Sequence, residues 1–191
     1  MRKLVIFLFS IFLAVSVYAQ PEFATDAGSF SLGGEILSVS SYGGELYDDA
    51  DNNRSFSVGL NPDFSVFVVP SLSIGAEFLV SYYLQGTYSH TSFGLGPSLV
   101  YYIAGHKERR VYPYIGVSFL FTKNNYKYSD SETDTNINST YLTGRAGVLF
   151  MLSSAVGLNL EYNYTDITSG TDNKTAGNKL YLGLGVKYYI F

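Results

Sequence analysis

The chain has 191 residues, no cysteine, and 12 Lys and Arg against 16 Asp and Glu, a formal net charge of −4. This length suits one domain, the lack of cysteine excludes disulfides and thiol chemistry, and the acidic balance argues against a nucleic-acid partner. The 18 tyrosines, 14 phenylalanines and 19 glycines, with only 15% charged residues, indicate a β-rich protein carrying the amphipathic aromatics that membrane interfaces select.

The first 19 residues have the pattern of a secretory signal peptide. Two basic residues precede an apolar run over 4–17, and Val17-Tyr18-Ala19 supplies a small-x-small cleavage site. The run is too short for a transmembrane helix, which needs about 20 apolar residues. We therefore expect a signal peptide at 1–19, a short N-terminal segment at 20–27 and one folded domain at 28–191. Cleavage leaves 10 basic against 16 acidic residues, a net charge of −6.

Eight segments then alternate apolar with small or polar residues, the period of a β-strand with two different faces. The first breaks its alternation between Leu37 and Ser41, which predicts a bulge. The second is the most regular, although Pro62 in it and Pro97 in the fourth each predict an irregular pair or bulge. In chain order the segments cover 28–42, 54–68, 72–85, 91–103, 111–123, 140–152, 156–167 and 180–191.

The connections between these segments alternate in length. Those at 69–71, 104–110 and 153–155 are short, whereas those at 43–53, 124–139 and 168–176 are long and polar, and 86–90 is a short member of the second set. Short turns at one rim and long loops at the other are typical of an outer-membrane barrel.

Every segment is long enough to span a bilayer, which takes about 9 to 11 tilted residues. Backbone groups in hydrocarbon must all be paired, so strands this apolar on one face require a closed sheet. A soluble β-sandwich is the alternative, but it has no need for strands so much longer than the usual five or six residues. We predict an all-β fold, an eight-stranded antiparallel up-and-down transmembrane β-barrel.

Outward aromatic residues should form two girdles about 25 Å apart, where the barrel meets the two lipid headgroup regions. One group falls near the loop rim and the other near the turn rim of the predicted strands. The loop-rim group is Tyr82, Phe93, Phe121, Tyr162 and Tyr164, and the turn-rim group is Phe64, Tyr101, Phe150 and Tyr188.

Four motifs in this order resemble the small OmpA/OmpX-like outer-membrane β-barrel family, the porin-family β-barrel domain. They are residues 61–75, Tyr-Pro-Tyr-Ile-Gly at 112–116, Leu-Asn-Leu-Glu-Tyr-Asn-Tyr at 158–164 and Leu-Gly-Leu-Gly-Val at 182–186. The resemblance covers the whole mature chain. It implies the outer membrane of a Gram-negative bacterium, periplasmic turns, cell-surface loops, and roles in membrane integrity, adhesion or stress.

Six charged residues share the inward phase of the strands. They are Glu35, Asp63, Glu77, Arg145, Glu161 and Lys187. Because eight strands leave a lumen that side chains just fill, we interpret them as a polar plug of ion pairs. Arg145 should lie diagonally opposite Glu161, and Arg145 or Lys187 should cross the lumen to the adjacent carboxylates of Asp63 and Glu77. The alternative is a small cation-preferring channel.

An enzymatic role is a distant alternative. His90 and Ser92 have the His-x-Ser spacing seen in barrel-shaped lipid A deacylases, but the next acid along the chain is Glu108, a strand away, and Ser92 faces inward. We therefore expect no catalysis, with His90 in a loop and His106 in a turn. Acidic runs at 45–51 and 130–134 lack EF-hand spacing, and no motif indicates a metal or cofactor.

The terminal Phe191 resembles the signal that the outer-membrane assembly machinery recognises. Its place in the alternation is unusual, because Ile190 continues the outward-facing series of the last strand and Phe191 comes one residue after it, in the inward phase. Either the strand bulges near Tyr188 and Tyr189 or the last residue curls off the rim. We expect further contacts with outer-membrane lipid and lipopolysaccharide, and with an extracellular ligand through the loops.

Overall fold

The computed structural model describes residues 21–43, 55–85, 88–128, 135–170 and 175–191. The predicted signal peptide and the acidic runs at 45–51 and 130–134 lie outside the described residues. Within the described ranges, no helix is long and apolar enough to cross a membrane.

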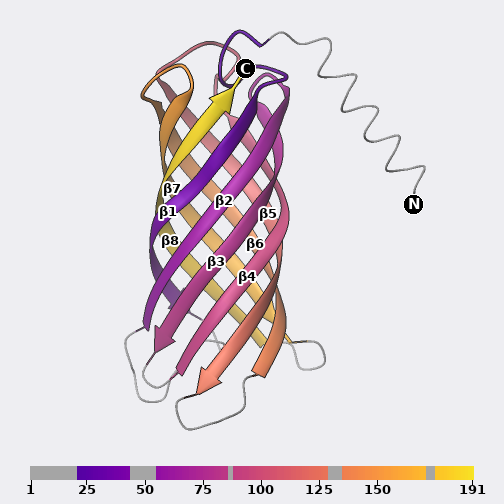
Figure 1. The fold of residues 1–191 in the computed structure, drawn as a ribbon, viewed down its shortest axis with the longest axis vertical. Coiled ribbons are helices and arrows are strands. Elements are labelled where there is room, and N and C mark those ends of the chain that lie inside the picture. The colour runs from indigo at the N-terminus through magenta and orange to yellow at the C-terminus, as the bar shows by residue number, and fades with distance from the viewer. Residues whose placement is uncertain (1–20, 44–54, 86–87, 129–134, 171–174) are drawn as a thin grey trace, which may run out of the picture.

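The described chain forms eight antiparallel strands in a closed barrel (Figure 1). Each strand pairs with its neighbours in sequence, and the last pairs with the first, so the predicted up-and-down topology is confirmed. Both ends of the described chain lie at one rim, together with the three short connections; we name this rim the turn end and the opposite rim the loop end. The strands are β1 Phe30–Gly43, β2 Ser55–Val69, β3 Leu72–Gln85, β4 Tyr88–Tyr102, β5 Val111–Tyr128, β6 Thr135–Met151, β7 Val156–Ser169 and β8 Thr175–Ile190.

Four strands reach three to five residues further toward the loop end than the sequence predicted, and β7 and β1 reach two residues and one residue further. β5 and β6 continue pairing through Tyr126 and Thr135, inside the expected loop at 124–139, and β4 and β8 begin before 91 and 180. The prediction used apolar alternation, which ends where the membrane would end. Backbone hydrogen bonds need no apolar side chain, so the ladder continues through Asn, Ser and Thr.

Both prolines interrupt pairing on one side only. The β2–β3 ladder omits the pairs at Asn61 and Pro62 and resumes at Asp63 in the same register, and the β4–β5 ladder likewise omits the pairs at Gly96 and Pro97. A proline lacks the N–H that a ladder pair needs. The expected irregular pair is therefore present at each site, without a bulge.

The predicted irregularity in β1 is confirmed as a bulge between Glu35 and Leu37, at the start of the expected region. Just before it, Gly34 has a φ of +134°, and a Cβ at this position would overlap the Asn61 carbonyl of β2. Only glycine tolerates this conformation and approach. Glu35 pairs with Asn61. From there toward the loop end, the described part of β1 forms ladder pairs with β8 and none with β2.

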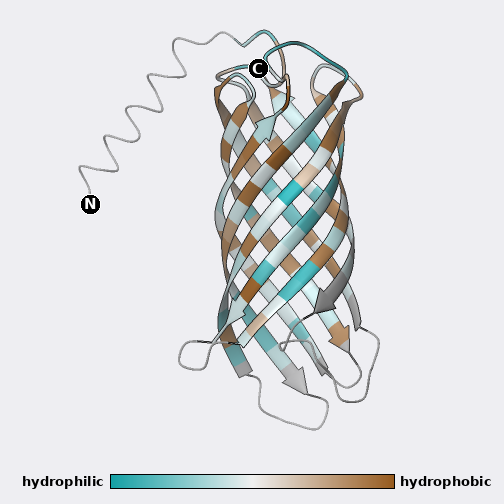
Figure 2. Cartoon of the chain, turned by 180° about the vertical axis from the view of Figure 1, so that it is seen from behind, coloured by the Kyte–Doolittle hydropathy of each residue, from teal (hydrophilic) through white to brown (hydrophobic). Residues whose placement is uncertain are grey.

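The two faces of the wall differ in polarity, as the alternating colours along each strand show (Figure 2). Outward leucine, isoleucine, valine and phenylalanine side chains are mostly about half exposed, which suits a surface solvated by lipid. The interior contains two apolar layers. The layer at the turn end is Ala24, Phe67, Val100, Tyr102, Tyr112, Tyr114, Leu149 and Tyr189, and that nearer the loop end is Leu79, Leu120, Tyr141 and Ile167.

Candidate functional site

A belt of charged side chains fills the lumen between the two apolar layers. The structure places all six predicted charged residues in it, each no more than 9% exposed. They come from six strands, namely Glu35 from β1, Asp63 from β2, Glu77 from β3, Arg145 from β6, Glu161 from β7 and Lys187 from β8. An ionised group so far from water needs a partner, so their mutual contacts define the belt.

Arg145 is the centre of the belt. Its guanidinium donates to the carboxylate of Glu77 and, over 2.8 Å, to the hydroxyl of Ser118, and it lies 3.7 Å from Glu161. These contacts join β6 to its ladder neighbours β5 and β7 and, across the lumen, to β3. One cation is thus shared by two buried carboxylates.

Lys187 forms the second ion pair, with its Nζ 2.6 Å from Asp63 Oδ2. The sequence left open whether Arg145 or Lys187 would reach the neighbouring carboxylates of Asp63 and Glu77. In the structure Arg145 pairs with Glu77, and Lys187 pairs with Asp63. Asp63 and Glu77 are ladder partners on β2 and β3, so separate cations relieve the repulsion between adjacent acids.

Asparagine side chains complete the belt, and the sequence reasoning did not identify them. Glu35 accepts hydrogen bonds from Asn61 at 2.9 Å and Asn163 at 2.7 Å, and Glu161 accepts one from Asn159 at 2.6 Å. All three asparagines lie in the inward phase of their strands, so the same alternation could have found them. Amide donors satisfy carboxylate lone pairs without adding charge.

The lumen nearer the loop end holds a second polar group. Ser92 donates to Asn124 at 2.5 Å, Asn124 to Ser139 at 2.7 Å, and Ser139 to Ser169 at 2.9 Å, a chain that crosses four strands. Lys179 lies 4.5 Å from the centre of the Tyr181 ring. Lys179 is a third buried base, which the predicted set of charged residues omitted.

The expectation that His90 lies in a loop is wrong. His90 belongs to β4, pairs with Tyr83 in the ladder, and is 6% exposed. Its ring lies 4.8 Å from that of Tyr83 and 5.1 Å from that of Tyr126. Polar neighbours in sequence suggested a loop, but main-chain pairing continues through them. His106 is in a turn, as predicted.

This geometry does not assemble a serine hydrolase site. The Ser92 hydroxyl is fully buried and donates to Asn124, so the His-x-Ser spacing does not produce a nucleophile activated by a base. Among the residues that the structure describes, no group of three or more His, Cys, Asp and Glu side chains is placed to hold a metal ion.

The N-terminal segment closes the turn end of the barrel. Ala24 joins the apolar layer at the turn end, and Thr25, fully buried, donates to the Gly105 carbonyl at 2.6 Å and accepts from the Ser71 amide at 3.0 Å. These bonds tie the segment to two different turns. The sequence predicted only a short N-terminal segment at 20–27, because its residues form no pattern that would indicate a buried position in the barrel.

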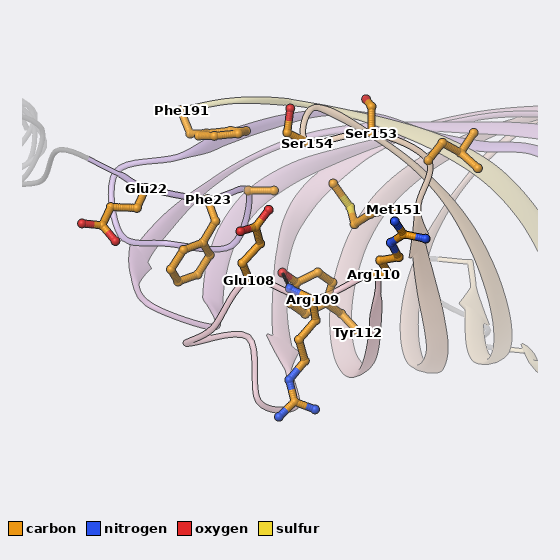
Figure 3. A pocket seen from close by; sticks show the side chains of 12 residues that line it. Glu22, Phe23, Glu108, Arg109, Arg110, Tyr112, Met151, Ser153, Ser154 and Phe191 are labelled. Carbon is orange, nitrogen blue, oxygen red and sulfur yellow. Dashed lines mark hydrogen bonds between the residues drawn. The ribbon is translucent and has the colours of Figure 1, made fainter.

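Phe191 lies just beyond β8 at this closed end. β8 pairs regularly up to Ile190, which is opposite Phe30, so the strand does not bulge near Tyr188 and Tyr189. The Phe191 ring lines a surface pocket of about 640 Å³ together with Glu22 and Phe23 of the N-terminal segment (Figure 3). Of the two possibilities that the sequence left open, a bulge or a last residue that curls off the rim, the structure has the second.

All nine predicted girdle residues face outward, with exposed fractions between 43% and 64%. Their positions along the strands are less uniform. Tyr101, Phe150 and Tyr188 lie next to the turn end, but Tyr162 lies near the middle of β7, opposite Ala146 and Leu182, and so further from the loop end than expected. The other members are Phe64, Tyr82, Phe93, Phe121 and Tyr164.

One cavity in the described lumen is small. It has a volume of about 20 Å³ and lies at the apolar layer nearer the loop end, lined by the four residues of that layer and by Asn61, Glu77, His90 and Lys179 among others. That volume holds about one water molecule. This part of the described lumen is therefore a closely packed polar interior.

Sequence comparison identifies the family of this barrel. The model for the outer membrane protein beta-barrel domain matches residues 6–188. The chain belongs to this family. No curated protein matches the sequence significantly.

Solved structures share the fold at low sequence identity. Neisserial surface protein A (NspA) superposes with a TM-score of 0.64 at 16% identity, covering 85% of this chain and 97% of that one. Ail of Yersinia pestis gives 0.55 at 15% identity, covering 86% and 99%, and OprG of Pseudomonas aeruginosa gives 0.53 at 15% identity, covering 87% and 98%. At these identities the likeness concerns the fold alone.

As a member of the outer membrane protein beta-barrel family, the protein resides in the outer membrane of a Gram-negative bacterium. Turns of such barrels face the periplasm and loops face the cell exterior. The turn end, with the N-terminal segment and Phe191, is therefore periplasmic, and the loop end is extracellular.

Proposed function

We propose that the protein is a structural outer-membrane barrel that acts through its surfaces, in membrane integrity or adhesion, and neither conducts solutes nor catalyses a reaction. The filled lumen carries this proposal. Two apolar layers and a belt of ion pairs occupy the interior, and the N-terminal segment covers the periplasmic end. A solute would have to displace all of them in series.

The surfaces left for contact are the lipid-facing wall and the extracellular end. The half-exposed apolar wall suits outer-membrane lipid and lipopolysaccharide. The strands project polar residues such as Asn125 and Asn136 beyond the apolar band, which supports contact with an extracellular ligand. The intervening loops lie outside the described residues.

A small cation-preferring channel is the second candidate. It is favoured by the charge balance of the lumen, where four buried carboxylates face three buried basic side chains among the described residues. An acidic lumen would select cations if it opened. The apolar layers on either side of the belt oppose this reading.

Planar-bilayer recording tests the closed lumen. We expect no conductance steps from the purified protein, because two apolar layers and the ion-paired belt obstruct the described lumen. A Leu149→Ala, Leu120→Ala variant, which removes one side chain from each layer, should begin to conduct. Steps from the wild-type protein that disappear in a Glu77→Gln, Arg145→Gln variant would establish the channel and refute the structural proposal.

We propose that Phe191 is the recognition signal for the assembly machinery. Its position outside β8 and its exposure of 42% support this role, because the residue is not occupied by strand pairing or by the packed lumen. Deleting Phe191 should reduce the amount of heat-modifiable barrel in the outer membrane several-fold, as measured on unboiled gels, while refolding in detergent stays normal. Normal insertion in cells would transfer the role to Tyr188 and Ile190.

A further inference from the structure

A groove of about 650 Å³ crosses the outer surface of β4 to β7 near the extracellular end. Outward side chains from two adjacent rows of the ladder form it. One row is Phe93, Lys123 and Asn138, and the other is Leu95, Phe121, Thr140 and Thr168. The volume is that of sites which hold small organic ligands.

The hollow results from unequal side-chain size within each row. Phe121 and Phe93 stand out from the wall, 64% and 57% exposed, whereas Thr140 and Thr168 beside them on β6 and β7 are short. The Phe119 ring packs edge-on against Phe121, with centroids 5.0 Å apart at 85°, and this contact fixes the wall of the groove.

The groove spans the boundary between the apolar band and the headgroup region. Phe121 is ten residues beyond the first residue of β5 and Lys123 is twelve. With about 3.3 Å per residue and a tilt of about 40°, these positions lie about 25 Å and 30 Å from the periplasmic rim. Phe121 thus reaches the top of the apolar band, and Lys123 lies at the level of the outer-leaflet headgroups.

Lys123 is also distinctive in charge. It is the basic residue that lines the groove, whereas Arg145, Lys179 and Lys187 are buried in the lumen. No acidic residue lines the groove, and Asn138, Thr140 and Thr168 add hydrogen-bonding groups beside the ammonium. The polar half of the groove therefore attracts an anion, and the apolar half attracts a hydrocarbon chain.

We propose that this groove binds one molecule of the phosphorylated glycolipid of the outer leaflet, lipid A. An acyl chain lies against Phe93, Leu95 and Phe121, and a phosphate on the sugar pairs with Lys123. The proposal rests on the proposed structural function and deepens it, because a specifically held lipid links the barrel wall to the surrounding leaflet.

Native mass spectrometry of the full-length protein released from detergent micelles tests the site, with lipid A as the titrant. Wild-type protein should retain one lipid A. Lys123→Gln should bind about tenfold more weakly, the effect of losing one charge-assisted hydrogen bond. Phe121→Ala should also weaken binding. Lys107→Gln, which neutralises an exposed lysine of a periplasmic turn, should bind as wild type does.

Dephosphorylated lipid A separates charge recognition from apolar adsorption. It should bind the wild-type protein as weakly as lipid A binds Lys123→Gln, and this variant should not distinguish the two lipids. Equal retention by wild type and Lys123→Gln would overturn the proposal. Equal binding of phosphatidylglycerol, or competition by millimolar inorganic phosphate, would also overturn it. Bilayer conductance would refute the closed lumen without changing these results, so the two failures are distinguishable.

Discussion

Replacing Arg145 with methionine should lower the free energy of unfolding by about 3–5 kcal/mol, the usual effect of removing one partner from a buried ion pair. The guanidinium contacts both Glu77 and Glu161 inside the lumen. Without it, these two carboxylates remain buried and repel each other. Urea titration of the barrel in lipid vesicles, followed by gel mobility and circular dichroism, measures the loss.

Two comparisons isolate the reason for this loss. Arg109→Met makes the same substitution at an exposed arginine of a periplasmic turn, so it should change stability little. Adding Glu77→Gln and Glu161→Gln to Arg145→Met should restore most of the lost stability, because the two carboxylates that the guanidinium served are then neutral amides. An Arg145→Met barrel as stable as wild type would mean that the charged belt does not hold the lumen together.

The alternation of side chains was sufficient to predict which residues line the lumen. Asp63, Glu77 and Lys187 were assigned inward from strand phase alone, and the structure places each of them there. Phase could not predict which groups meet across the lumen. Arg145 reaches Glu77 from β6 to β3, and that contact depends on the tilt and stagger of the closed sheet, which no local pattern encodes.

The alternation of apolar and polar residues could not predict where the strands end or how the periplasmic end of the barrel is closed. Apolar periodicity marks where lipid touches the wall, so polar strand ends such as that containing His90 were assigned to loops. Thr25 gave no signal, because its role depends on the Gly105 carbonyl, 80 residues away. The inward phase of Asn61, Asn159 and Asn163 can be deduced from the same alternation, but their hydrogen bonds to Glu35 and Glu161 depend on the closed sheet.

Replacing Leu184 with lysine should reduce stability by about 2–4 kcal/mol, the effect of a lysine on the lipid face at the bilayer midplane. Leu184 is 43% exposed on β8, opposite Leu160 of β7, and lies six residues from the end of the strand at Ile190. That places it about 15 Å above the periplasmic rim, near the middle of the apolar band.

Val58 provides a depth control for this prediction. It is similarly exposed, at 45%, but lies eleven residues from the end of β2 at Val69 and pairs with Tyr82. Its height of about 28 Å is at the headgroup boundary, where lysine should lower stability by about 0–1 kcal/mol. Urea unfolding of both variants in vesicles gives the difference. Equal losses would contradict the placement of the wall in the bilayer, because lipid solvation is the reason that the two sites should differ.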